Sequence, residues 1–308
     1  MGRPLTASLA GRLRRHELKH AGSSFTLRRA LTTAPEHLDP RAAIQHCAQL
    51  TRKYEFGQSM CNLLLPRQLQ ATHVVLRAVN IETARVADQA KGELQGRMRL
   101  QWWKDAVEAA TSDELIHPAA LHPSFRTPVV AALAGVWKQR RDAGHTLDRR
   151  WLLRSIDARI AALDPAQPQE MYALEKYAEE TASGPLYLLL QAAGYRGAIA
   201  AKAGGEAGLS VAEAATCRAA SHIGNALGLT ILLRAAPHYA AVRQCPLPET
   251  LMIAHGVSQE DFYRALPRAT GETGDCGIDS GTSDGGVRSL SAMQVHILQS
   301  VTEIFDRA

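Results

Sequence analysis

The chain has 308 residues, of which 46% are hydrophobic and 21% are charged, a balance typical of a globular protein. Aromatic residues make up only 5% of the chain, and this favours helices because strands are enriched in aromatic residues. No apolar run approaches the roughly 18 residues that a membrane-spanning helix requires. The five cysteines contain no C-x-x-C pair, so we expect buried reduced thiols rather than a zinc site or a disulfide framework.

Positive charge is concentrated at the N-terminus. Residues 1–34 contain seven Arg or Lys against one acid and carry +6, and since the whole chain carries +5, the remainder carries −1. A nearly neutral body argues against a nucleic-acid groove and leaves open only a local basic patch. The leader is rich in Arg, Ser and Thr and poor in acids, which is typical of an organellar transit peptide, with the mitochondrion favoured over the plastid. The alternative is a basic tail without a targeting role.

Helical periodicity begins at Pro40, and the sequence predicts an all-α body. The expected helices cover residues 40–54, 67–89, 93–110, 129–142, 148–163, 170–193, 210–234 and a short segment from 258. After this body the composition shifts to Gly, Ser, Thr and Asp, as in a flexible linker. The predicted organisation is a leader, a helical domain, a Gly-rich linker and an amphipathic helix, at residues 1–38, 39–268, 269–288 and 289–308.

Three local patterns refine this outline. Residues 63–65 are three leucines before a proline, and they are expected to form a buried turn. A kink is expected at residues 183–185, because Pro185 removes an intrahelical hydrogen bond. Ser210 and Glu213 have the spacing of a capping box at the start of a helix.

Two helical regions, followed by shorter matching segments, resemble the paired signature regions of the squalene/phytoene synthase family. The first covers residues 77–88 and is followed by 97–103; the second covers 224–239 and is followed by 246–248. The resemblance extends over about residues 42–266 and implies an isoprenoid (trans-prenyl) synthase-like helical bundle. The family continues with several more helices beyond this point, so the bundle is expected to lack its last helices.

In the enzymes of this family, two aspartate-rich motifs hold the magnesium ions that grip the substrate diphosphates. Here the resemblance places five residues at those motif positions: Ala84, Arg85, Asp88, Ala235 and Tyr239. Only one of them is acidic, so the resemblance implies a degenerate metal and diphosphate site, with no catalytic residue, bound metal or cofactor. A proline within the second motif should also break the helix that presents it.

Five further residues are candidates for a retained cavity: Arg77, Gln101, Trp102, Trp103 and Arg234. Core packing is favoured over a substrate platform for the two tryptophans. The two arginines could bind an anion or form ion pairs with Asp88 or Glu82. Gln101 could make a hydrogen bond that supports the fold.

Several segments resemble one branch of the family in particular, the branch that assists assembly of respiratory complex I (NADH:ubiquinone oxidoreductase). They are residues 54–56, 61–66, 80–88, 99–103, 179–181, 221–224, 233–237 and 251–262, with 255–262 the most specific. This resemblance implies a non-catalytic mitochondrial assembly factor, a pseudoenzyme on the matrix side of the inner membrane. Its implied partners are complex I subunits or other assembly factors, with peripheral membrane association. Two alternatives stay open: an active head-to-head prenyl transferase and an isoprenoid- or lipid-binding protein.

Overall fold

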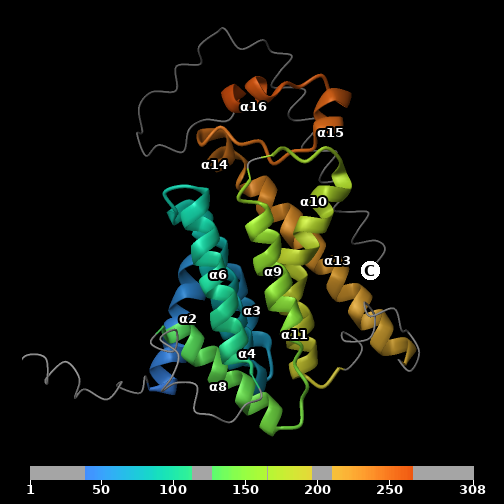
Figure 1. Cartoon of the computed structure of the whole chain (residues 1–308). Coiled ribbons are helices and arrows are strands. Elements are labelled where there is room, and N and C mark those ends of the chain that lie inside the picture. The colour runs from blue at the N-terminus through green and yellow to red at the C-terminus, as the bar shows by residue number, and fades with distance from the viewer. Residues whose placement is uncertain (1–38, 113–126, 165, 196–209, 266–308) are drawn as a thin grey trace, which may run out of the picture. The chain divides into compact units, whose positions relative to one another are not determined.

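Helices form every regular element in the described chain, which comprises residues 39–112, 127–164, 166–195 and 210–265 of a computed structural model (Figure 1). The predicted all-α class is therefore confirmed. The predicted leader, the Gly-rich linker and the C-terminal amphipathic helix lie outside the described residues.

The first six helices of the described chain supply most of the main core, although none of the core residues lies on α3. These helices are α2 (Pro40–Tyr54), α3 (Phe56–Leu64), α4 (Arg67–Ala84), α5 (Val86–Gln89), α6 (Glu93–Ala110) and α8 (Pro128–Asp142). Helix α2 begins where the sequence predicts, because Asp39 accepts a hydrogen bond from the backbone N–H of Arg41 and Pro40 occupies the first turn. Helix α4 packs against α2 and α8, and its buried side chains, Val75 and Leu76 among them, join the main apolar cluster.

The second set of helices carries the other signature region. It comprises α9 (Arg150–Ala161), α10 (Met171–Ala178), the π-helical turn η2 (Glu179–Ser183), α11 (Gly184–Ala192), α13 (Val211–Arg234), α14 (Ala236–Ala241), α15 (Glu249–Ala254) and α16 (Gln259–Ala265). The predicted capping box is present, since the Ser210 side chain accepts from the Glu213 N–H and the Glu213 carboxylate accepts from the Ser210 N–H.

Helix α13 lies unusually close to α10 and η2. A β-carbon on Gly224 would overlap Ser183, and one on Gly228 would stand only 2.7 Å from the β-carbon of Ala178. The two glycines are four residues apart and thus share one face of α13. Their missing side chains permit this close approach.

The expected helix 67–89 is not continuous, because it is divided at Arg85 into α4 and α5, an interruption that the sequence did not predict. The two predicted interruptions, at residues 183–185 and at Pro237, are present with differences in detail. In the expected helix 170–193, the irregularity is a π-helical turn that ends at Ser183, and Pro185 follows in the first turn of α11. Likewise α13 ends at Arg234, and Pro237 lies in the first turn of α14.

The predicted burial of residues 63–65 is wrong. Leu63 and Leu64 are among the most exposed apolar residues of the described chain. They end α3, a helix in which none of the described residues is buried. The prediction failed because burial requires a covering neighbour, which an apolar run alone does not specify. Cys61 on the same helix is also exposed, whereas Cys47, Cys217 and Cys245 are buried as expected.

Candidate functional site

The two signature regions meet at a pair of side chains from distant parts of the chain. Oδ1 of Asp88 on α5 lies 3.3 Å from Nε2 of His238 on α14. Both side chains are more than half exposed, so solvent weakens their interaction. The one carboxylate left at the five motif positions thus has an imidazole from the other region beside it.

The other motif positions hold no metal-binding oxygen except a phenol. Ala84 and Ala235 have only methyl side chains. The Arg85 guanidinium lies 4.2 Å from the centre of the Tyr54 ring and 3.5 Å from Oε1 of Glu82. Its positive charge is therefore held by the protein's own π-face and carboxylate.

Tyr239, the fifth motif position, is a neutral phenol. Burial, with smaller contributions from the nearby Tyr177 and Asp88, raises its pKa to about 12, while Arg159 opposes the shift. The phenol can donate or accept a hydrogen bond at neutral pH, but it carries no charge with which to hold a cation.

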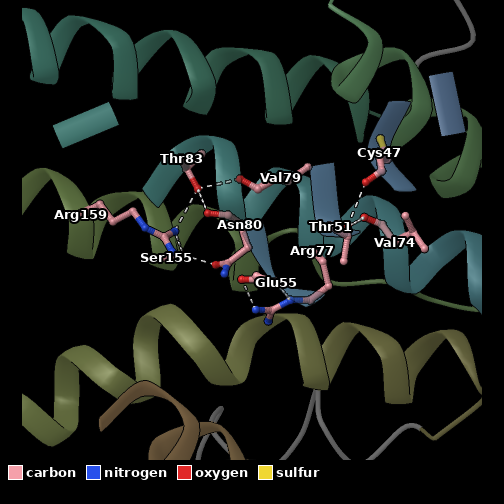
Figure 2. A network of polar contacts seen from close by, with 10 residues as sticks. All are labelled: Cys47, Thr51, Glu55, Val74, Arg77, Val79, Asn80, Thr83, Ser155 and Arg159. Carbon is pink, nitrogen blue, oxygen red and sulfur yellow. Dashed lines mark hydrogen bonds and ion pairs between the residues drawn. The ribbon is translucent and has the colours of Figure 1, made fainter. Parts of the chain in front are cut away.

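Arg77 is buried and belongs to a polar network inside the helical body (Figure 2). Its Nε and Nη2 atoms donate to the two carboxylate oxygens of Glu55, at 2.6 and 2.5 Å. This two-point ion pair replaces the expected pairs with Asp88 or Glu82. Those acids instead contact His238 and Arg85.

Arg159 on α9 lies in the same network and was missed in the sequence analysis (Figure 2). Only 8% of it is exposed. Its Nη1 donates to Thr83 Oγ1 at 3.0 Å and to Ser155 Oγ, and its Nη2 donates to Asn80 Oδ1 at 2.8 Å. Burial lowers the pKa of Arg159, and the charge of Arg77 also acts in this direction.

The buried network carries an excess positive charge. Arg77 is neutralised by Glu55, whereas Arg159 has hydrogen bonds only to neutral oxygens among the described residues. A guanidinium has five N–H donors, and the three bonds of Arg159 leave two of them for another acceptor. Such a site attracts anions and repels cations.

A sequence signal for Arg159 does exist. It follows Leu152 and Ile156 at spacings of seven and three residues, so it lies on the buried stripe of the predicted helix 148–163. An arginine on an apolar stripe requires hydrogen-bonding partners in the interior. The sequence alone does not identify those partners, because two of them come from α4.

The five candidate cavity residues occupy different environments. Arg77 and Trp103 are buried, whereas Gln101, Trp102 and Arg234 are exposed. The two indoles make an edge-to-face contact at 5.1 Å between ring centres. Gln101 donates to Asp105 Oδ1 at 2.8 Å within its own helix, which makes this hydrogen bond a local one on the surface.

A second polar cluster joins η2, α11 and α13. The carboxylate of Glu179 accepts hydrogen bonds from Ser183 Oγ and Tyr187 OH, both at 2.6 Å, and from Ser221 Oγ at 3.0 Å. Burial and the nearby Glu179 raise the pKa of Tyr187, so this phenol remains a hydrogen-bond donor. Because its donors come from three elements, this carboxylate fixes their relative positions.

Two features of the described ranges bear on the class of site. Within them, no three side chains of His, Cys, Asp or Glu come together in a way that could hold a metal ion. In the same ranges, no helix has the length and apolar character needed to cross a bilayer.

The chain belongs to the squalene/phytoene synthase family, whose family model matches residues 51–273. The fold is shared with a dehydrosqualene synthase crystallised with a ligand, at a TM-score of 0.60 and 14% identity over 87% of this chain and 77% of that one. It is also shared with squalene synthase HpnC from Alicyclobacillus acidocaldarius, at a TM-score of 0.59 and 17% identity over 89% and 86% of the two chains. At such identities the likeness concerns the fold alone.

Within the family, the chain is similar to proteins named NADH dehydrogenase (ubiquinone) complex I, assembly factor 6. It is 37% identical to the Mus musculus protein over 219 residues and 36% identical to the Homo sapiens protein over 219 residues. The Drosophila melanogaster homolog is 31% identical over 227 residues. The matched region covers 71% of this chain but 57% of either mammalian relative.

Proposed function

We propose that the chain is a non-catalytic assembly factor for respiratory complex I on a prenyl synthase fold. The observation that carries this proposal is the 36–37% identity to mammalian proteins named for complex I assembly, which far exceeds the 14–17% identity to the synthases. The proposed role is to bind complex I subunits or other assembly factors, and not to transform a substrate.

The charges at the site support the absence of magnesium chemistry. Mg²⁺ requires several oxygen ligands, usually with one or two carboxylates among them. Of the five motif positions only Asp88 supplies a carboxylate, and His238 already lies beside it. The buried network behind the motifs has a net positive charge, which disfavours a divalent cation. We therefore infer that the magnesium-binding aspartates of the family have been lost.

The proposed location is the matrix side of the mitochondrial inner membrane, with peripheral attachment. The basic, acid-poor leader at residues 1–38 supports mitochondrial import as a transit peptide. The names of the curated relatives support the same compartment, since each refers to complex I.

The test is a gene disruption, with assembled complex I measured by native gel and in-gel NADH dehydrogenase staining. Loss of the chain should lower assembled complex I. The intact chain and an Asp88→Ala variant should restore it equally. An unchanged level of complex I would contradict the proposal. Magnesium-dependent release of diphosphate from farnesyl or geranylgeranyl diphosphate would instead support the prenyl transferase alternative.

One observation favours a second candidate, an isoprenoid- or lipid-binding protein. Arg159 is buried, and two of its N–H groups have no hydrogen-bond acceptor among the described residues. None of its described partners is a carboxylate, so an anionic lipid head group could accept the two remaining hydrogen bonds and balance the charge. Native mass spectrometry of the purified chain should then reveal a bound anionic lipid that an Arg159→Met variant lacks. A chain free of ligand in every preparation would count against this candidate.

A further inference from the structure

Helix α3 presents an uncovered apolar face. Its large apolar residues are Phe56, Met60, Leu63 and Leu64, which are 58%, 44%, 67% and 87% exposed. They follow one another at intervals of four, three and one residues, so they lie within one face of a helix. A helix whose apolar side is open to water to this extent marks an interaction surface.

The exposed charged residues in the segment 52–67, which contains α3, are all positive. Arg52 and Lys53 precede the helix, Arg67 follows it, and all three are exposed. The one acid in the described segment 52–67 is Glu55, whose side chain is 18% exposed and paired with the buried Arg77. The apolar face is thus flanked at both ends by basic residues that form no ion pair with any acid among the described residues.

We propose that α3 docks the chain on an anionic lipid bilayer, with its apolar face in the interface and its basic flanks on the lipid head groups. This deepens the peripheral membrane association in the proposed function and rests on it. Basic residues beside an exposed apolar helical face are the combination that anionic membranes bind. A nine-residue helix is about 13 Å long and cannot span a bilayer, so it lies in the plane of the interface.

Tyr54 adds to this surface an aromatic residue that suits a lipid interface. Its partly exposed ring lies at the α2–α3 junction. Nζ of Lys53 lies 5.0 Å from the centre of this ring, and the Arg85 guanidinium carbon lies 4.2 Å from it. An aromatic residue with a polar hydroxyl and nearby cations is suited to the head-group region.

The chain offers a matched control on another helix. Leu94 and Met98 on α6 are 75% and 66% exposed, about as open to water as the α3 leucines. Their surroundings differ because Glu93 pairs with Arg97 on the same surface. Non-specific hydrophobic adsorption to a membrane would involve the exposed apolar residues of both α3 and α6, whereas the proposed docking involves α3 alone.

The first experiment is flotation of the full chain with phosphatidylcholine vesicles, with and without roughly one quarter phosphatidylglycerol. Leu63→Asn/Leu64→Asn should weaken partitioning to anionic vesicles about tenfold or more, and Leu94→Asn/Met98→Asn should leave it unchanged. Replacing Arg52 or Lys53 by Gln should weaken binding about fivefold per charge at low salt. Equal loss with the control variant, or equal binding to neutral vesicles, would overturn the proposal.

The second experiment reports from α3 itself. Cys61 is exposed on α3, while Cys47, Cys217 and Cys245 are buried. In a Cys276→Ser background, a polarity-sensitive dye on Cys61 should shift to the blue when anionic vesicles are added. Flotation without such a shift would show that another surface carries the binding.

Complex I rescue separates this inference from the proposed function. If the intact chain restores complex I but does not bind vesicles, the lipid inference fails and the assembly role stands. If the Leu63→Asn/Leu64→Asn variant still floats with anionic vesicles yet no longer co-purifies complex I subunits, α3 is a protein-docking face and the lipid inference is overturned. If the chain binds vesicles through α3 but gene disruption leaves the level of complex I unchanged, the assembly role is refuted and the lipid inference stands.

Discussion

The buried ion pair between Arg77 and Glu55 provides the sharpest test of the internal charge balance. Glu55→Gln removes the one carboxylate that neutralises this network and leaves Arg77 and Arg159 buried together without a counter-charge. Breaking a buried pair by removing one partner costs about 3–5 kcal/mol. We take about 3 kcal/mol, because the Glu55 side chain is 18% exposed and water relieves part of the penalty.

Thermal and urea unfolding followed by far-UV circular dichroism would measure this cost. For a body of this size, 3 kcal/mol corresponds to a melting temperature lower by about 6–12 °C. Glu93→Gln is the matched control, because Glu93 forms an exposed pair with Arg97, and its effect should stay within about 0.5 kcal/mol. The double variant Glu55→Leu/Arg77→Met should recover most of the lost stability, since it removes both charges. A Glu55→Gln cost no larger than that of the control would refute the charge argument.

Three other predictions concern separate parts of the fold. Gly228→Ala should destabilise the chain by about 1–3 kcal/mol, because the new methyl group would lie 2.7 Å from the β-carbon of Ala178. The control Gly135→Ala, on α8, has no neighbouring atom within 4 Å of the new methyl group and should be neutral or stabilising when the two variants are compared by chemical denaturation. Ser210→Ala should cost about 1 kcal/mol through loss of the cap on α13, and the same assay would detect it. Burial lowers the pKa of His73 from 6.5 to about 4, so as the pH falls the unfolded chain takes up a proton at a higher pH than the folded chain does. The free energy of unfolding should therefore decrease as the pH drops from about 6.5 towards 4, and unfolding measured across this range should show a flatter profile for a His73→Asn variant.

Local signals in the sequence were sufficient for many helix boundaries. Pro40 starts α2, and Ser210 with Glu213 starts α13, because these caps depend only on neighbours along the chain. Pro237 ends the second signature helix for an equally local reason. The family resemblance then supplied the arrangement of the helices, which periodicity alone does not contain.

The interior of the candidate site depends on contacts that no local signal specifies. Arg77 pairs with Glu55, 22 residues away, and Arg159 bonds Asn80, 79 residues away. Neither partner could be chosen from the sequence, because several acids and amides lie at similar separations. The exposure of Leu64 was unpredictable for a related reason: it depends on which neighbouring elements cover α3.

The π-helical turn η2 acts as a one-residue insertion in an otherwise continuous helix. An extra residue rotates everything after it by about 100° relative to an uninterrupted α-helix. As a result, Leu174 and Ala178 on α10 join the small apolar cluster with α13, while Tyr187 and Leu188 on α11 join the main cluster. Deleting one residue in η2 would restore a regular helix and turn one of these faces away from its core, so the chain length of this segment is as constrained as its composition.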